Sequence, residues 1–327
     1  MNKQGVHKKI KPLKVKPIPV PAGYLHPKPK YAQLPTHEFT MGLIAPKGAG
    51  KTTVICNLLQ FYKGYFHTIL VFSPTIESDE KWDYIKKQKL LIKNLPLKKW
   101  LQDQAAKKAG DEIVEAPPIS AELENKITNS DEDFDGTIPE EHYFNDYDDE
   151  TFQGIMEEQL SMIKALKKHG QPKYLANRIL VIFDDLVGSA LFRGARGSYF
   201  KGVNTRHRHF SASFLMVSQG YKEIPKTIRT NWTALIVFEI GNEREVFVIY
   251  EEYACCLKQK DWQESYRHAV DGDHDFLFIN FQQPKKYRMM KNFEQFLIHD
   301  EVDKTIPERK RIREDSDSED EDVVPIK

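Results

Sequence analysis

Residues 39–53 decide the fold. They read Phe-Thr-Met-Gly-Leu-Ile-Ala-Pro-Lys-Gly-Ala-Gly-Lys-Thr-Thr, an apolar run followed by small residues. A segment with helical character, Thr53–Tyr62, comes next. Strand, glycine-rich loop and helix in this order form the Walker A motif, here [AG]xxxxGK[ST] at Ala45–Thr52. The stretch therefore predicts a P-loop nucleotide site at the end of a buried strand.

The loop composition suits a triphosphate. Small residues let successive backbone N–H groups curl around phosphates, and the following helix adds the positive end of its dipole. Lys51 is expected to reach the β- and γ-phosphates, and Thr52 to ligate Mg²⁺. Ala45 stands where many such loops have glycine, a position that needs small size. The expected ATP-binding residues are Ala45, Pro46, Lys47, Gly48, Ala49, Gly50, Lys51, Thr52 and Thr53.

Four further apolar runs accompany the first. Continuous apolar runs separated by helix-like segments are typical of a parallel sheet that is covered on both faces. We therefore predict an α/β fold with a doubly wound, mainly parallel sheet of the P-loop NTPase (RecA-like/ASCE) type. The runs are Phe39–Ile44, Thr68–Phe72, Ile179–Phe183, Ser213–Val217 and Ala234–Glu239.

The run Ile179–Phe183 ends in two acids, Asp184 and Asp185, as a Walker B strand does. A buried strand would deliver Asp184 beside the phosphate loop, where it can hold Mg²⁺ directly or through water. Asp185 is the candidate general base for the attacking water, or else it caps the next helix.

The run Ser213–Val217 ends in Ser218 and Gln219. In the hydrolysing branch of P-loop proteins, an extra strand lies between the Walker A and Walker B strands. Gln219 would then emerge beside the lytic water and sense the γ-phosphate, or it would only cap the end of its strand.

With these motifs and the stretch Ile224–Asn231, the chain resembles the FtsK/HerA superfamily over Phe39–Phe281. It is most similar to the genome-packaging ATPases of poxvirus-like giant viruses, virophages and Maverick/Polinton transposons. One departure concerns the second acid, because cellular members commonly have Asp-Glu where this chain has Asp184-Asp185. The shorter Asp185 must approach the water differently.

This resemblance implies a homo-oligomeric ring of five or six subunits that threads double-stranded DNA and hydrolyses ATP at subunit interfaces. Such a site takes an arginine from the neighbouring subunit. The candidates are Arg206, Arg208 and Arg229, with Arg206 and Arg229 ahead; each is otherwise a surface or phosphate-contacting residue. DNA contact is expected to be independent of sequence, with capsid proteins as further partners.

Two other functions remain open at the level of sequence. A nucleotide-dependent scaffold or binding protein without turnover would keep Walker A and tolerate loss of Asp184, Asp185 and Gln219, all of which are present. A different P-loop enzyme, such as a nucleotide kinase, would need an arginine-rich lid, and none is visible.

Net charge is zero, but the charges are unevenly distributed. Residues 1–36 form a basic, Pro/Lys-rich arm, expected to be flexible, that either follows DNA phosphates or serves as a solubilising or targeting tail. The ATPase domain is placed at 37–292, with an acidic insertion at 110–150 that is read as a solvated loop, after which a helical period resumes at Asp148–Lys168.

Residues 293–327 form a C-terminal tail in which Arg309–Arg313 precede an acidic run that contains Ser316 and Ser318. The basic cluster is either a nuclear import signal or part of a solubilising tail. No apolar run is long enough to cross a bilayer, and Cys56, Cys255 and Cys256 are read as reduced packing residues. We therefore expect an intracellular protein, in the host nucleus or at a viral assembly site.

Overall fold

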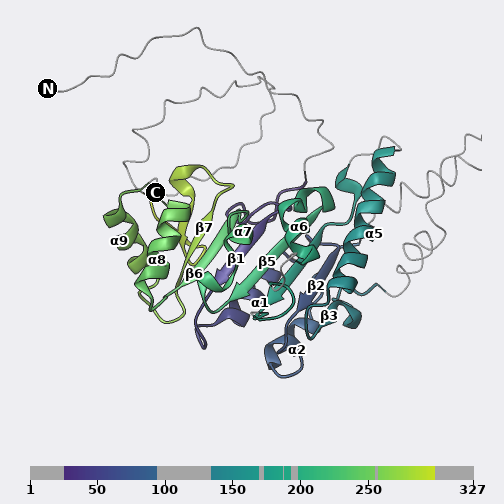
Figure 1. The fold of residues 1–327 in the computed structure, drawn as a ribbon, viewed down its shortest axis with the longest axis horizontal. Helices are drawn as coiled ribbons and strands as arrows, with labels where there is room; N and C mark the ends of the chain where they lie inside the picture. The colour runs from purple at the N-terminus through teal and green to yellow at the C-terminus, as the bar shows by residue number, and fades with distance from the viewer. Residues whose placement is uncertain are drawn as a thin grey trace, which may run out of the picture.

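The computed structural model describes residues 26–93, 134–168, 173–186, 188–192, 198–254 and 257–298. Its centre is a nine-stranded sheet in the order β3-β2-β4-β5-β1-β6-β7-β8-β9 (Figure 1). The strands from β3 to β6 in this order are parallel, and β7, β8 and β9 continue the sheet antiparallel. Their bounds are β1 Thr40–Ile44, β2 Thr68–Phe72, β3 Tyr143–Phe144, β4 Ile179–Asp184, β5 Ala212–Ser218, β6 Ala234–Phe238, β7 Phe276–Asn280, β8 Met289–Lys291 and β9 Gln295–Phe296.

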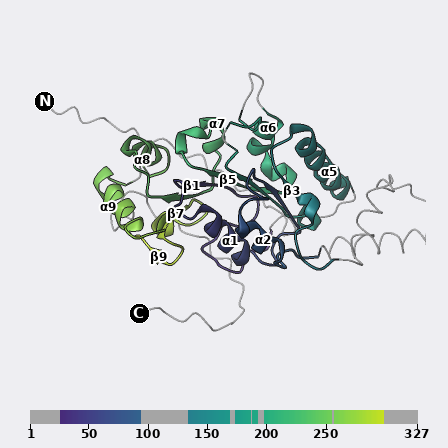
Figure 2. The same ribbon diagram turned by 90° about the horizontal axis from the view of Figure 1, so that it is seen from below.

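Helices cover both faces of this sheet (Figure 2). One face carries α1 (Lys51–Phe61) and α2 (Glu80–Lys86), and the other carries α5 (Asp149–Lys168), α6 (Tyr199–Thr205), α7 (Lys226–Arg229) and α8 (Glu243–Ile249). Helix α9 (Gln259–Ala269) packs at the β7 end. Shorter turns lie at Glu140–His142 (η2), Lys173–Leu175 (η3), His207–Phe210 (η4), Tyr221–Glu223 (η5), Tyr250–Ala254 (η6) and Lys285–Tyr287 (η7).

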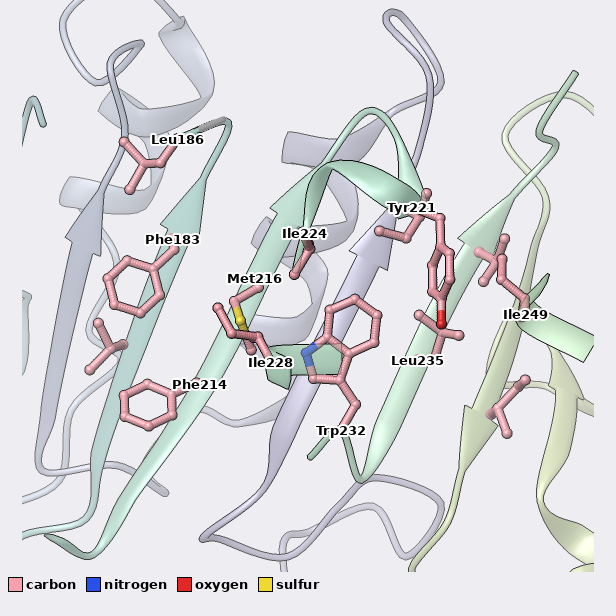
Figure 3. Close-up of a cluster of buried hydrophobic side chains, with 14 of the residues drawn as sticks. Phe183, Leu186, Phe214, Met216, Tyr221, Ile224, Ile228, Trp232, Leu235 and Ile249 are labelled. Carbon is pink, nitrogen blue, oxygen red and sulfur yellow. The ribbon is translucent and has the colours of Figure 1, made fainter. Parts of the chain in front are cut away.

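The core has two layers because alternate strand residues point to opposite faces of the sheet. In β4, Val181 and Phe183 join the cluster under α5, α6 and α7, while Leu180 and Ile182 join the cluster under α1 and α2. Figure 3 shows the first cluster, in which Phe183 and Phe214 of neighbouring strands lie near each other. Burial on both faces explains why the strands read as continuous apolar runs.

The predicted fold is confirmed. All five expected strands are present, and β5 lies between β1 and β4, as the hydrolysing branch of P-loop proteins requires. Helix α5 follows the predicted period. The three antiparallel strands were not predicted, although Phe276–Asn280 is as apolar as the others.

The acidic insertion differs from expectation in its last part. Residues 134–150 belong to the packed fold: Tyr143 and Phe144 form the edge strand β3, which pairs with β2. Phe144 also stacks on Phe72, with ring centroids 4.5 Å apart. The aromatic residues that stand among the acids therefore pack this segment against the sheet. The prediction of a loop followed from the high average content of acidic residues, which hides these aromatic side chains.

The packed unit is also larger than the predicted 37–292. At its start, the hydroxyl of Tyr65 donates to the carbonyl of Pro27 and that of Tyr62 to the carbonyl of Pro35, both at 2.7 Å. At its end, β9 extends the sheet to Phe296. The remaining predictions on residues 1–25, 94–133 and 299–327, and on Cys255 and Cys256, lie outside the described residues. Among the helices of the described ranges, none has the length and apolar character needed to span a membrane.

Candidate active site

The carboxyl ends of β4, β5 and β1 meet at one edge of the sheet. Ile44 of β1 is in register with Ser218 of β5, and Asp184 of β4 with Val217. The loop after β1, the acid pair after β4 and Gln219 after β5 therefore leave the sheet side by side. This arrangement joins the two Walker motifs, as the sequence predicts.

The Walker A loop turns tightly into α1. Gly48 and Gly50 adopt positive φ angles of 83° and 104°, a region that glycine enters without strain. Gly50 is the N-cap of α1, whose first turn carries no acid. The unneutralised N-terminus keeps its positive potential for an anion such as a phosphate.

Asp185 lies at the centre of the polar contacts. Its Oδ2 accepts a hydrogen bond from Nε2 of Gln219 at 2.8 Å and lies 3.9 Å from Nζ of Lys51. The side chain is 28% exposed, so a water molecule can reach it. Asp185 has φ 53°, in the left-handed region that Asp and Asn tolerate better than most residues.

Asp184 is buried beside it, with 4% of its surface exposed. Burial is the main cause that raises the pKa of its carboxyl, to about 6. The charge of Asp185 also raises this pKa, whereas the hydrogen bond from Ser73 and the charge of Lys51 lower it. The hydroxyl of Ser73 donates to Oδ2 of Asp184 at 2.9 Å. A carboxyl held in this way keeps its charge more readily beside a cation.

The hydroxyl of Thr52 donates to Oδ2 of Asp79 at 3.1 Å, and not to Asp184. Hydroxyl and carboxylate oxygens are the ligands that Mg²⁺ prefers. The described residues contain no group of three His, Cys, Asp or Glu that could hold a metal ion. With oxygen donors on Thr52 and Asp184, the edge fits an ion such as Mg²⁺, which takes one or two protein ligands and keeps water and phosphate in its shell.

Three residues at this edge were not identified from the sequence. Ser73 follows β2 directly, and Asp79 caps α2, with Oδ1 accepting from the backbone N–H of Lys81. The position of Asp79 before a helix was a signal for a cap, but not for contact with Thr52. His274 comes from a loop more than 200 residues along the chain, and its Nδ1 hydrogen-bonds the carbonyl of Ala49 in the Walker A loop at 3.0 Å.

Two of the three candidate arginines lie apart from this edge. Arg206 and Arg208 are exposed and directly precede β5, so they lie at the amino edge of the sheet. Arg229 is 6% exposed; Nη1 pairs with Glu252 at 3.0 Å, and the guanidinium lies over the ring of Tyr221. Because Arg229 is buried and paired within its own subunit, this placement does not fit the expected arginine finger.

Comparison with known proteins gives one family match. Residues 126–260, less than half of the chain, match the model of the Poxvirus A32 protein. The match contains β4, the acid pair and Gln219, and it begins after the Walker A loop. No curated protein sequence gives a significant match.

Several solved structures are similar at low identity. The genome packaging NTPase B204 of Sulfolobus turreted icosahedral virus 2, in complex with AMPPCP, is 11% identical with a TM-score of 0.43, over 77% of this chain and 96% of B204. The pCW3 conjugation coupling protein TcpA is 12% identical with a TM-score of 0.45, over 81% and 62% of the two chains. The type VII secretion ATPase EccC of Thermomonospora curvata is 12% identical with a TM-score of 0.43, over 84% and 30%.

At such identities and TM-scores, the assignment depends on the chain's own residues and on the family match. The joined Walker A and Walker B elements make a P-loop site with the groups needed for hydrolysis. The match over residues 126–260 covers the Walker B half of that site. The chain therefore has the fold and the joined Walker motifs of a P-loop ATPase, and over residues 126–260 it is similar to the Poxvirus A32 protein.

Proposed function

We propose that this ATPase moves double-stranded DNA and packages a viral or virus-like genome into a capsid. The observation that carries the proposal is the contact of Asp185 with both Lys51 and Gln219, in a region that matches the Poxvirus A32 protein. A chain that only binds nucleotide has no need for a partly exposed carboxylate held between the phosphate lysine and a polar sensor.

In the proposed reaction, the backbone amides from Gly48 to Thr52 and the ammonium of Lys51 hold the β- and γ-phosphates. Thr52 and Asp184 would hold Mg²⁺, which would neutralise charge on the phosphates. Asp185 accepts the proton of the attacking water, and Gln219 orients Asp185 and senses whether the γ-phosphate is present.

A trans arginine completes the proposed ring. Arg206 and Arg208 lie at the edge opposite their own Walker A loop, so either could serve only the site of a neighbouring subunit. Both arginines are exposed, so both stay candidates, and Nε of Arg206 also donates to the carbonyl of Gly202 in α6. DNA binding is proposed to be independent of sequence and to weaken as salt rises, since lysines and arginines displace counterions from phosphates.

The test is ATP turnover with and without long duplex DNA. Stimulation by DNA supports a translocating motor, whereas turnover that DNA never changes contradicts it. Absence of turnover in every condition supports the scaffold, and phosphate transfer to a nucleotide supports a kinase. The viral assembly site is the proposed location, and imaging of the tagged chain beside particle markers checks it.

A further inference from the structure

The order of the strands determines on which side a bound nucleotide leaves the Walker A loop. The groups suited to the γ-phosphate and the lytic water, Asp184, Asp185 and Gln219, come from β4 and β5 on one side of β1. A triphosphate that extends along this edge with its γ end toward β5 would direct its nucleoside end toward β6 and β7, on the other side of β1.

A large groove lies on that other side. It has a volume of about 870 Å³ and lies between α8 and α9, next to the residues that follow β6. Val237 of β6 is in register with Ile44 of β1, so Glu239–Gly241, which line the groove, leave the sheet beside the Walker A loop. The groove and the loop therefore open at the same edge of the sheet.

The loop from α9 to β7 connects the two. Val270 and Asp271 line the groove, and three residues later His274 contacts the Walker A loop at the carbonyl of Ala49. Lys291 of β8 braces this connection through ion pairs with Asp271 and, at 2.7 Å, with Asp275. A ligand that fills the groove would thus contact residues 270–271, which belong to the same loop as His274, the residue that contacts the Walker A loop.

The lining has the chemistry of a base site. Phe247 is 42% exposed there and is the aromatic face that a base can reach, whereas Trp262 and Tyr266 are buried behind it. The polar residues of the lining include Glu239, Gln259 and Gln263. Aromatic faces bind planar bases by stacking, and a few polar groups then set which base is preferred.

We propose that this groove receives the base and ribose of the nucleotide whose phosphates lie on the Walker A loop, with His274 at the junction. The proposal rests on the ATPase function, and it names the part of the site that distinguishes ATP from inorganic phosphates. A neighbouring subunit is the other occupant of suitable size, and the experiment below separates the two.

The key variant is Gly241→Phe. A Cβ at Gly241 meets no atom within 4 Å, so the new ring enters the open groove without displacing the core. Phe247→Ala removes aromatic surface from the same groove. Gly154→Phe is the matched control, because Gly154 of α5 also has no atom within 4 Å of its Cβ and lies outside the groove.

Two ligands are compared by competition against a fluorescent ATP analogue: AMPPNP, which carries a nucleoside, and inorganic triphosphate, which does not. We expect Gly241→Phe to weaken AMPPNP roughly tenfold or more and Phe247→Ala by a smaller factor, both with triphosphate affinity unchanged. Gly154→Phe should bind both ligands as the wild type does. Thermal unfolding confirms that each variant is folded.

Any other result of this competition experiment contradicts the proposed nucleoside subsite. Unchanged affinity for AMPPNP in Gly241→Phe places the nucleoside elsewhere. If Gly241→Phe loses affinity for AMPPNP and for triphosphate equally, the groove supports the phosphate loop and has no nucleoside subsite. If it binds AMPPNP normally but its subunits associate differently, the groove belongs to the contact with a neighbouring copy. If the wild type binds neither ligand, the ATPase function itself fails.

Discussion

Asp185 shows how one backbone angle shapes the site. Its N–H donates to the carbonyl of Val217 at 3.2 Å, and its φ of 53° turns the side chain toward Gln219 and Lys51. A glutamate is less suited to the left-handed region than aspartate. The backbone turn thus brings the short side chain of Asp185 into contact with Gln219 and Lys51, whereas a glutamate would reach them through its extra methylene.

Asp185→Asn should separate binding from hydrolysis. Asparagine tolerates the same φ and remains able to hydrogen-bond, but it cannot accept a proton from water at neutral pH. We expect nucleotide affinity close to that of the wild type and turnover lower by about 10²- to 10⁴-fold. Fluorescent-nucleotide binding and phosphate release measure the two quantities.

Lys51→Ala is the companion control for this variant and should lose nucleotide binding itself. Turnover of Asp185→Asn at the wild-type rate would remove Asp185 from the reaction.

At the scale of elements, contacts between segments distant in the chain decide the geometry of β1 and α2. Gly42 lies in β1 directly under the ring of Trp232, where an added Cβ would approach the ring to 2.4 Å. Figure 3 shows this indole among Met216, Ile228 and Leu235 in the core. Glycine is needed here for close approach, and its φ is ordinary.

Gly42→Ala should destabilise the protein by about 1–3 kcal/mol, because overpacking a dense core moves side chains or backbone. Urea unfolding followed by tryptophan fluorescence measures the change. Gly42→Ala combined with Trp232→Phe, which makes the ring smaller, should recover part of the loss, and no difference between the two variants would contradict the packing argument.

Asp79 has two contacts that a substitution can separate. Serine retains the capping of α2 but is too short to accept from Thr52. We expect Asp79→Ser to unfold like the wild type while it loses part of the Mg²⁺ enhancement of nucleotide binding. Asp79→Ala should lose that enhancement and also about 1 kcal/mol of stability.

Titration of nucleotide affinity with Mg²⁺, beside urea unfolding, measures both effects. An Asp79→Ser protein with the full Mg²⁺ response would mean that Asp79 only caps the helix.

At the scale of the molecule, the two edges of the sheet differ in chemistry. The carboxyl edge carries the acids of the site, whereas the amino edge buries neutral histidines. Burial lowers the pKa of His67 to about 3, helped by the charge of Arg178, and it also lowers the pKa values of His37 and His207. These rings hold backbone groups; for example, Nδ1 of His67 accepts from the backbone N–H of Arg178 at 2.9 Å.

The amino edge should make stability depend on pH. An unfolded histidine binds a proton near pH 6.5, whereas these folded rings do so at lower pH, so the stabilisation is complete above pH 6.5 and is lost as pH falls. For His67 the loss between pH 6.5 and 5 is about 2 kcal/mol. Urea unfolding at pH 7.5, 6.5 and 5 measures it.

His67→Asn is the control, because its amide oxygen can replace Nδ1 as an acceptor and does not titrate. The variant should show a shallower fall of stability with acid. Equal slopes for the two proteins would exclude His67 as a source of the pH dependence.

Sequence alone predicted the parts of this protein whose signals are local. The glycines and Lys51 of the Walker A loop, the apolar strand before Asp184 and the strand before Gln219 each act through residues next to them in the chain, so a motif or a period is enough to find them. For the same reason, five strands and the parallel core were predictable.

Tertiary structure decided the rest, because those contacts join segments that no local pattern connects. Asp79 meets Thr52 across 27 residues, and His274 meets Ala49 across 225. Arg229 has the same charge as Arg206 in the sequence, but only the fold buries Arg229 against Glu252 and leaves Arg206 exposed. Local residue chemistry determines which groups are available, and only the packing of distant segments determines which of them meet.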